Sequence, residues 1–285
     1  HQTMDLTFKV GQLLHDLSWT GYEGFAVDNY FVQRLKGGQF MNTDTLPAGD
    51  TSIQKSPQPC NSAFTYRIKA VDSLGNFSYS DTAKNEALDT INPNRAQLRN
   101  VSIVKDGIVE VTFKGADSLD IFAYDIKRQR AGGNFQLTKR VLFDSAGGTF
   151  TIQDTTATRQ DQLCYTILTQ DSCLNTVSSD TFCAVQLSAE GGQLQNQLNW
   201  TAFEGRQVDS YQVQRFINGT WQSVGSVSGS DTSFIDSSNT RCNTSYDYRI
   251  QASWQEQGQS FRSLSDTASA VPFDTVNPEA PDVRA

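Results

Sequence analysis

Cysteine and histidine carry the most reactive side chains of this sequence, and both are scarce. The chain of 285 residues contains five cysteines and two histidines. His1 is terminal, so His15 alone could supply an imidazole base or a zinc ligand. His15 lies in an alternating apolar and polar stretch at residues 14–19, and we place it on the polar, solvated face. We therefore predict no site role for it.

The short motifs that build common catalytic sites are missing from the sequence. There is no dinucleotide-binding or phosphate-binding glycine loop, no His-Glu-x-x-His, no calcium loop and no Gly-x-Ser-x-Gly elbow. Glu23 and Glu204 occupy the same loop of repeated copies, which favours a structural role. We predict no catalytic residue, no cofactor and no metal site.

Ligand binding through an exposed aromatic side chain remains open. Trp221 stands at the repeat position of Phe40, which favours packing over binding. Trp254 has no counterpart in the first copy and is our candidate for ligand contact. Tyr22 and Phe25 are further exposed candidates.

The charge balance excludes several classes of partner. Lys plus Arg total 23 and Asp plus Glu total 31, for a formal net charge of −8. Nucleic-acid affinity rests on cations that neutralise phosphates, and an anionic membrane surface repels a negative chain. No stretch approaches the roughly 20 apolar residues of a membrane helix, and the first residues have neither the basic n-region nor the apolar h-region of a secretory signal. We expect neither nucleic-acid binding nor membrane insertion, and we read the chain as a mature or excised segment.

An internal repeat organises the chain. The pattern at residues 11–34 recurs at 192–215 with a constant offset of 181, and both copies end in Asp-Thr-x-Asn-Pro. A more divergent copy lies between them, with Phe113 in the place of Trp19 and Tyr124 in the place of Tyr30. We therefore expect domains at 1–92, 93–186 and 187–278, with residues 279–285 beginning a truncated following domain.

Within each copy the hydrophobic period is two, which is typical of half-buried strands. The stretches 64–70 and 246–252 alternate apolar with polar residues, and Gly, Asn, Asp and Ser clusters separate such runs. About seven short strands fit each copy, so the pattern predicts an all-β sandwich. Trp19, Tyr30, Tyr66 and their equivalents should fill its core.

These residues resemble fibronectin type III domains. The features are a Trp on the second strand, Tyr-x-Val-x-Arg on the third, and on the sixth Tyr-x-x-x-Ala followed by a Gly-Asn and Ser-x-Ser turn, as at residues 66–80. The resemblance spans all three copies and implies three tandem sandwiches arranged end to end. It implies little about activity, since this fold hosts many roles.

A narrower resemblance concerns the Ser-Asp-Thr endings, the Asp-Thr-x-Asn-Pro linkers and the cysteine pattern of the middle copy. They look like the repeat arrays of long secreted Bacteroidota surface proteins, which precede a gliding-motility-associated C-terminal domain that directs export by type 9 secretion. That domain is absent from these 285 residues. Convergence on turn chemistry is the alternative explanation.

An odd cysteine count in a secreted-looking chain needs an account. Cys164 and Cys183 open the sixth and close the seventh strand of the middle copy, so we predict a disulfide across that hairpin. Cys60 and Cys173 lie at facing ends of successive domains, and we predict an inter-domain bridge. Cys242 then remains unpaired because its partner belongs to the truncated domain. The alternative is that Cys60, Cys173 and Cys242 are free thiols.

The predicted function is a non-catalytic structural or adhesive stalk segment of a large secreted cell-surface protein, related to gliding or adhesion. Its partners would be other domains of the same polypeptide and a glycan or surface ligand. Predicted disulfides favour an extracellular location. The alternative is an accessory spacer or carbohydrate-contacting array of a secreted glycan-degrading enzyme. A receptor ectodomain of cytokine-receptor type is disfavoured by the cysteine placement.

Overall fold

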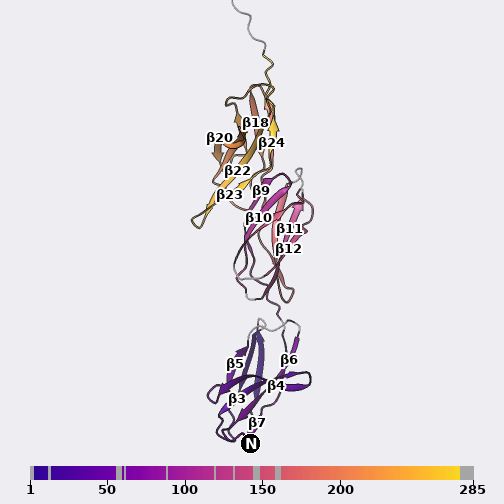
Figure 1. Ribbon diagram of the computed structural model, residues 1–285, viewed down its shortest axis with the longest axis vertical. Coiled ribbons are helices and arrows are strands. Elements are labelled where there is room, and N and C mark those ends of the chain that lie inside the picture. Colours follow the sequence, from indigo (N-terminus) through magenta and orange to yellow (C-terminus); the bar gives the residue numbers. More distant parts are fainter. Residues whose placement is uncertain are drawn as a thin grey trace, which may run out of the picture. The chain divides into compact units, whose positions relative to one another are not determined.

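The computed structural model describes residues 3–11, 14–55, 60, 62–87, 89–118, 120–130, 132–143, 148–157 and 162–276. The predicted start of a following domain, 279–285, lies outside them. All regular elements of the described residues are β-strands, numbered β1 to β24 (Figure 1). No helix among them is long and apolar enough to cross a membrane.

The first sandwich consists of two antiparallel sheets. One sheet has the order β1-β2-β5, and the other has the order β4-β3-β6-β7 with β8 also paired to β6. The strands are β1 (Leu6–Gly11), β2 (Leu14–Trp19), β3 (Asn29–Lys36), β4 (Gln39–Pro47), β5 (Ser52–Lys55), β6 (Ser62–Val71), β7 (Phe77–Tyr79) and β8 (Ala83–Ala87).

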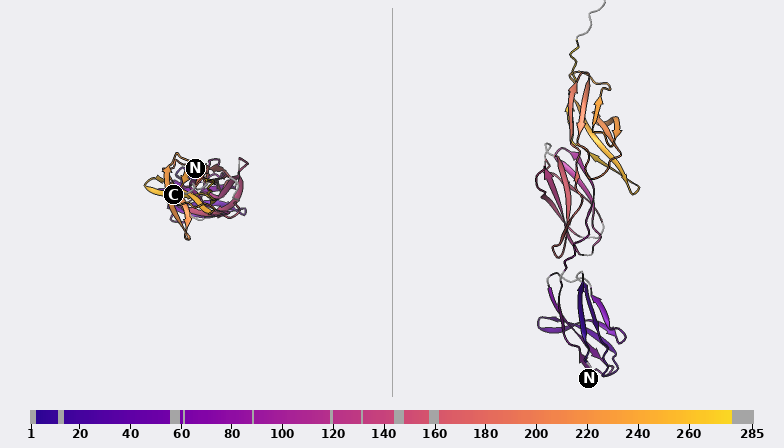
Figure 2. Two further views of the ribbon diagram at one scale, coloured as in Figure 1. Left: turned by 90° about the horizontal axis from the view of Figure 1, so that it is seen from above. Right: turned by 180° about the vertical axis from the view of Figure 1, so that it is seen from behind.

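The middle sandwich repeats this plan, as Figure 2 shows from behind. Its sheets have the orders β13-β10-β9 and β12-β11-β14-β15, with β16 paired to β14. The strands are β9 (Gln97–Lys105), β10 (Ile108–Lys114), β11 (Ile121–Arg130), β12 (Gln136–Leu142), β13 (Thr149–Asp154), β14 (Leu163–Asp171), β15 (Thr176–Ser178) and β16 (Phe182–Cys183).

The third sandwich has sheets β17-β18-β21 and β20-β19-β22-β23, with β24 paired to β22. The three copies therefore confirm the predicted all-β class and the fibronectin type III-like fold. The strands are β17 (Leu187–Gly192), β18 (Gln195–Trp200), β19 (Ser210–Ile217), β20 (Thr220–Ser228), β21 (Ser233–Asp236), β22 (Tyr246–Glu256), β23 (Gln259–Leu264) and β24 (Ala268–Ala270).

The cores follow from the period-two pattern. On β6 the apolar side chains from Phe64 to Ala70 are buried at every second position. Trp19, Tyr30 and Tyr66 are buried as predicted, with 6%, 2% and 0% of their surface exposed. Because successive side chains of a strand point to opposite faces, one such strand supplies a wall of the core and a polar outer surface.

Two recurring motifs have structural explanations. A buried tyrosine hydroxyl accepts a backbone hydrogen bond from the residue eight positions earlier in each sandwich: Tyr30 from Tyr22, Tyr124 from Ala116 and Tyr211 from Phe203.

The second recurring motif is the serine of Ser-Asp-Thr. In the third copy, Ser265 Oγ accepts a hydrogen bond from Ile250 N at 2.8 Å and donates one to Asp266 O at 2.6 Å. Ser80 and Ser179 make the equivalent pair of bonds. The Ser-Asp-Thr sequence therefore recurs because its serine satisfies backbone polar groups just before the last strand of each sandwich.

His15 lies in the core and not on the polar face, so that prediction is wrong. The buried positions of β2 are His15, Leu17 and Trp19, and His15 has 0% of its surface exposed. Its Nδ1 lies 3.1 Å from the hydroxyl of Tyr66. The correct face follows from parity, since His15 shares the alternation of Leu17 and Trp19.

By internal contacts the chain forms two compact units. One consists of residues 1–93 with the segment 170–176, and the other of residues 94–169 with 177–285. The predicted limits at 92/93 and 186/187 remain predictions, since the middle and third sandwiches share one compact unit and one hydrophobic core cluster.

Strand β23 of the third sandwich lies along strand β9 of the middle one within this unit. Ser263 Oγ donates a hydrogen bond to Val101 O at 2.6 Å, and Leu264 N donates one to Ser102 Oγ at 3.0 Å. Ser263 is fully buried there. The edges of two sandwiches thereby satisfy each other's polar groups.

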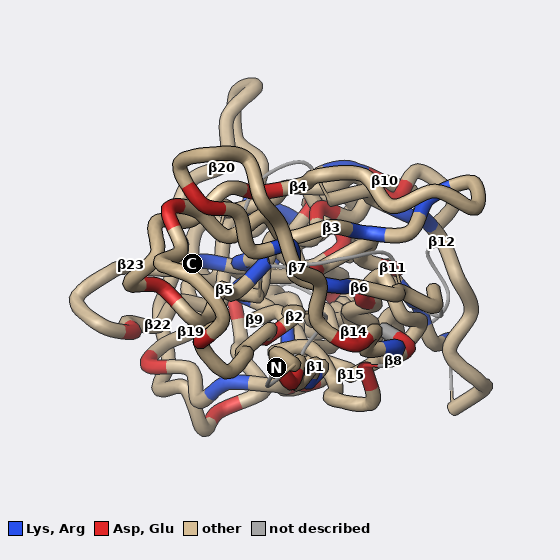
Figure 3. Tube along the Cα trace, turned by 90° about the horizontal axis from the view of Figure 1, so that it is seen from below, with Lys and Arg blue, Asp and Glu red and all other residues tan. Residues whose placement is uncertain are grey.

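Charged residues are interspersed along the trace (Figure 3). Lys and Arg alternate with Asp and Glu on both strands and loops, without a long run of one sign in the described residues.

Candidate functional site

The first candidate site is the cysteine pair of the middle sandwich. Cys164 on β14 and Cys183 on β16 are directly opposite each other in the antiparallel register. They form a disulfide, with 4.0 Å between their Cα atoms. The structure confirms the disulfide that was predicted across this hairpin. Both residues are buried, so the bridge crosslinks β14 and β16 away from solvent.

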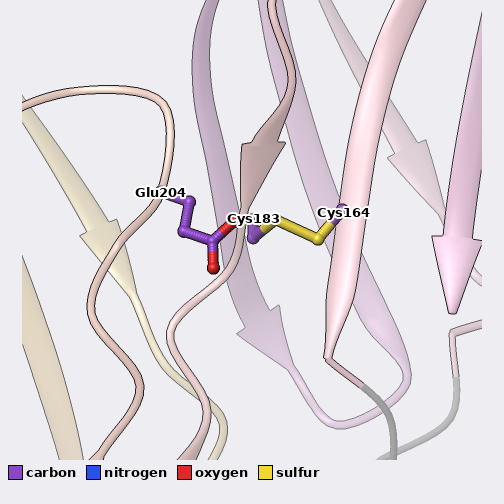
Figure 4. A group of neighbouring side chains, drawn as sticks. All are labelled: Cys164, Cys183 and Glu204. Atoms are coloured by element: carbon purple, nitrogen blue, oxygen red, sulfur yellow. Dashed lines mark hydrogen bonds between the residues drawn. A yellow bond between two sulfur atoms is a disulfide. The ribbon is translucent and has the colours of Figure 1, made fainter. Parts of the chain in front are cut away.

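Glu204 extends its carboxylate toward this disulfide (Figure 4). Its Oε2 lies 3.2 Å from Cys183 Sγ, and its backbone oxygen accepts a hydrogen bond from Cys183 N at 3.2 Å. Two cysteines and a carboxylate are a set that can hold a metal ion, but only as thiolates. In the disulfide both sulfurs are oxidised. The contacts of Glu204 with Cys183 therefore connect a loop of the third sandwich to β16 of the middle sandwich.

The second disulfide joins Cys60 to Cys173, residues 113 positions apart. Their Cα atoms are 5.3 Å apart, within the usual range for a bridge. Cys173 lies in the turn between β14 and β15, yet the segment 170–176 belongs by its contacts to the first compact unit. The bridge thus joins the first sandwich to a hairpin of the middle one.

Asp171 shapes the turn that presents Cys173. Its Oδ1 accepts hydrogen bonds from Cys173 N and Asn175 N, both at 2.8 Å, and its Oδ2 accepts one from Asn175 Nδ2 at 2.9 Å. Asp72 and Asn76 form the same turn in the first sandwich, with Leu74 in the place of Cys173. The turn is therefore a scaffold of the repeat, and the cysteine is an addition to it.

Cys242 is a free, half-buried thiol. It occupies the repeat position of Cys60 and shares its local geometry. Ser62 Oγ donates a hydrogen bond to Cys60 O at 3.3 Å, and Thr244 Oγ1 donates one to Cys242 O at 3.5 Å. That a further domain supplies its partner remains a prediction.

Trp254 is buried, so the exposed position on which its predicted ligand contact rested is wrong. Only 2% of its surface is exposed. Its ring stacks on Phe203 at 4.9 Å and on Phe261 at 5.8 Å between centroids. The physical reason is that β22 continues to Glu256, so that Trp254 keeps the inward parity of Tyr248, Ile250 and Ala252.

Tyr22 and Phe25 are half-buried and rest against each other, with centroids 4.6 Å apart, beside the first core. Trp221 is half-buried on the outer face of β20 and is absent from the core clusters. Its ring lies 4.5 Å from the guanidinium of Arg249. Trp221 lines an open polar cleft.

Sequence reasoning missed the buried ion pairs of two sandwiches. Arg215 Nη1 lies 2.6 Å from Asp236 Oδ2, which also accepts a hydrogen bond from the hydroxyl of Tyr248 at 2.8 Å. Arg128 and Asp154 form the equivalent pair at 2.5 Å, with the hydroxyl of Tyr165. Burial together with Asp154 raises the pKa of Tyr165 well above its usual range.

The arginines of these ion pairs were visible as part of Tyr-x-Val-x-Arg. Their carboxylate partners carried no sequence signal, because they lie 21 and 26 residues away on another sheet.

No protein-family model matches this sequence, and no curated protein matches it. Solved structures that resemble it include the FN1–FN3 domains of chicken CNTN1, with 14% identity, 95% of this chain and 98% of that chain covered, and a TM-score of 0.27.

Two others are a tetra-tandem repeat from the extending region of a large adhesion protein and a structure concerned with host cell surface retention of a 1.5-MDa bacterial ice-binding adhesin. They are 15% and 13% identical, cover 96% of this chain each and 75% and 99% of those chains, and have TM-scores of 0.34 and 0.26.

Proposed function

We propose that this chain is a non-catalytic, load-bearing segment of a secreted cell-surface protein, with a structural or adhesive role. The observation that carries the proposal is the overlap of its two disulfide loops. One loop closes residues 60–173 and the other closes residues 164–183, so the loops share residues 164–173.

This overlap decides how a pulling force travels along the chain. Tension that arrives at Cys60 passes through the bridge to Cys173 and from there to Cys183. Residues 61–163, which include β6 to β13, lie outside the loaded path, and residues 164–172 share the load through the Cys164–Cys183 bridge. Strands β6 to β13 therefore are not drawn out into extended chain while the Cys60–Cys173 bridge is intact.

Two further features support a stalk. The middle and third sandwiches share one hydrophobic core cluster, which couples them without a covalent bond. Disulfides form and persist in oxidising compartments, in agreement with an extracellular location. The linker phrases support a finer assignment to long Bacteroidota surface proteins exported by type 9 secretion and linked to gliding.

The alternative is an accessory array of a glycan-degrading enzyme, with exposed aromatic side chains touching the carbohydrate. Trp254 is part of the core and is removed from these candidates, whereas Trp221 borders a polar cleft.

The loaded path is tested by pulling single molecules of the 285-residue chain from both ends, with and without reductant. Complete reduction adds the 113 residue steps between Cys60 and Cys173 to the path. At about 3.3 to 3.6 Å per extended residue, this amounts to roughly 400 Å of extra extension. Equal contour lengths in both states would contradict the mechanism.

The cellular role is tested by mass spectrometry of the unreduced parent protein from the cell surface and from the medium. A long repeat polypeptide on the surface, with Cys60 linked to Cys173, supports the stalk. A hydrolase fused to these repeats in the medium supports the accessory array and removes the stalk.

A further inference from the structure

A polar cleft of about 440 Å³ opens between the middle and third sandwiches, within one compact unit. One wall is the turn from β9 to β10, with Val104, Lys105 and Asp106. The opposite wall is the outer face of the third sandwich, with Trp221, Asp247, Arg249 and Ser269. No predicted or proposed function uses this cleft.

Arg249 is the best-defined cation of the cleft. Its Nε donates a hydrogen bond to Gln214 Oε1 at 2.7 Å, which holds the guanidinium in place. One face of the guanidinium lies over Trp221. Among the described residues, the only hydrogen bond of the Arg249 side chain is made by Nε, so its Nη atoms are available to a ligand.

The first sandwich provides an internal comparison. Arg67 occupies the position of Arg249, and its Nε donates to Gln33 Oε1, also at 2.7 Å. Its guanidinium lies between two rings, 4.1 Å from Phe40 and 3.8 Å from Tyr79.

In the third sandwich the register places Leu264 where the first has Tyr79. Trp221 replaces Phe40, but no second ring among the described residues covers Arg249. In the first sandwich, aromatic rings thus cover both faces of the Arg67 guanidinium. In the third sandwich, a ring of the described residues covers only one face of the Arg249 guanidinium, and the other face is open to the cleft.

The other charges of the cleft restrict the ligand. Lys105 is a second cation, and Asp106, Asp247 and Asp266 are three carboxylates. Burial and the nearby Arg262 lower the pKa of Arg249. A group with more than one negative charge, such as a phosphate monoester, would be repelled by the three carboxylates, whereas a single carboxylate can pair with Arg249.

The remaining wall suits a ligand with many hydroxyl groups. Ser269 Oγ donates to Asp247 Oδ1 at 2.5 Å, and the outer oxygen of Asp247 can accept from a ligand hydroxyl. Trp221 supplies an apolar surface beside these polar groups. Sugar rings offer the matching combination of an apolar C–H face and several hydroxyls.

We propose that this cleft binds an acidic saccharide with one carboxylate per ring, of the uronic acid type. The ring carboxylate pairs with Arg249, the hydroxyls bond to Asp247 and Ser269, and Trp221 packs against the ring. The load-bearing role requires no ligand. A failure of saccharide binding would therefore not contradict the load-bearing role, and a failure of the load-bearing role would not contradict saccharide binding.

The test is calorimetric titration of the 285-residue chain with hexamers of galacturonate, mannuronate and guluronate. Fully methyl-esterified hexagalacturonate is the matched neutral probe, because it keeps the hydroxyls and loses the charge. We expect at least one acidic hexamer to bind, and we expect Arg249→Gln to weaken its binding about tenfold or more, as loss of a charge-assisted pair requires.

Arg67→Gln is the matched control variant, since it removes the same side chain from between the two rings of the first sandwich. It should leave binding unchanged. Thermal unfolding of both variants separates lost binding from lost folding, and Trp221→Phe provides a second variant that keeps an aromatic wall.

Absence of binding by all three acidic hexamers at millimolar concentration would overturn the proposal. Equal binding by wild type and Arg249→Gln, or by the acidic and esterified probes, would overturn it as well.

Discussion

The Nδ1 atom of His15 lies 3.1 Å from the hydroxyl of Tyr66 in the core of the first sandwich. In the third sandwich the same position holds Asn196, 2.8 Å from the hydroxyl of Tyr248. The strand register pairs His15 with Lys55 and Asn196 with Asp236. The first sandwich thus carries a histidine and a lysine where the third carries an asparagine and a buried carboxylate.

This exchange predicts that acid destabilises the first sandwich. Burial, Arg34 and Lys55 lower the pKa of His15 to about 4, with only Asp16 opposing them. Between pH 6.5 and 4 the unfolded chain binds a proton that the folded chain does not, so stability falls as the pH falls. The loss is at most about 3 kcal/mol.

Hydrogen exchange of β2 and β6 amides across this pH range measures the effect. His15→Asn copies the third sandwich and should flatten the pH dependence. An unchanged profile in His15→Asn would assign the acid sensitivity to other groups.

The buried pair of Arg215 and Asp236 predicts a strongly asymmetric response to mutation. Asp236→Asn leaves the Arg215 guanidinium buried without its counter-charge, and we expect a loss of about 3 to 5 kcal/mol of unfolding free energy. The double variant Arg215→Met with Asp236→Leu removes both charges and should be markedly less destabilised. Urea unfolding of the three proteins checks this. A double variant as unstable as the single one would show that the hydrogen bonds of Asp236 to Tyr248 and Ser238 dominate.

Trp254 and Trp221 predict opposite outcomes for one substitution. Trp254→Ala removes a ring stacked between Phe203 and Phe261, and we expect a loss of about 3 to 5 kcal/mol. Trp221→Ala removes a ring from the outer face and should cost much less. Denaturant unfolding of the second compact unit measures both. Equal losses would mean that Trp221 packs more tightly than its half-buried position indicates.

The cysteine assignments predict selective labelling. In unreduced protein made under oxidising conditions, iodoacetamide should modify Cys242 alone, because the other four cysteines are in disulfides. Peptide mapping by mass spectrometry identifies the modified residue. Labelling of Cys60 or Cys173 would show that their bridge had not formed. Cys242→Ser should abolish labelling and serves as the control.

The site could be predicted in part. The disulfide of Cys164 and Cys183 follows from hairpin geometry, and that of Cys60 and Cys173 from the ends of successive domains. The cleft at Arg249 could not be predicted, because it depends on which side chain covers the far face of the guanidinium. Leu264 and Tyr79 are equivalent only once the strand register is known.

The sequence by itself determined the strands and their repetition. Alternation of apolar residues sets which face of a strand is buried, and an offset of 181 residues carries the same pattern into the third copy. Such local signals need no knowledge of the partner strand.

Only the tertiary structure decided which distant groups meet. Strand β23 lies along β9, Asp236 reaches Arg215 from another sheet, and the segment 170–176 joins the first unit. These contacts connect residues whose spacing has no fixed period, since loops of variable length separate them. Their energy depends on burial and on the geometry of side chains from different strands, which the order of residues along the chain does not encode locally.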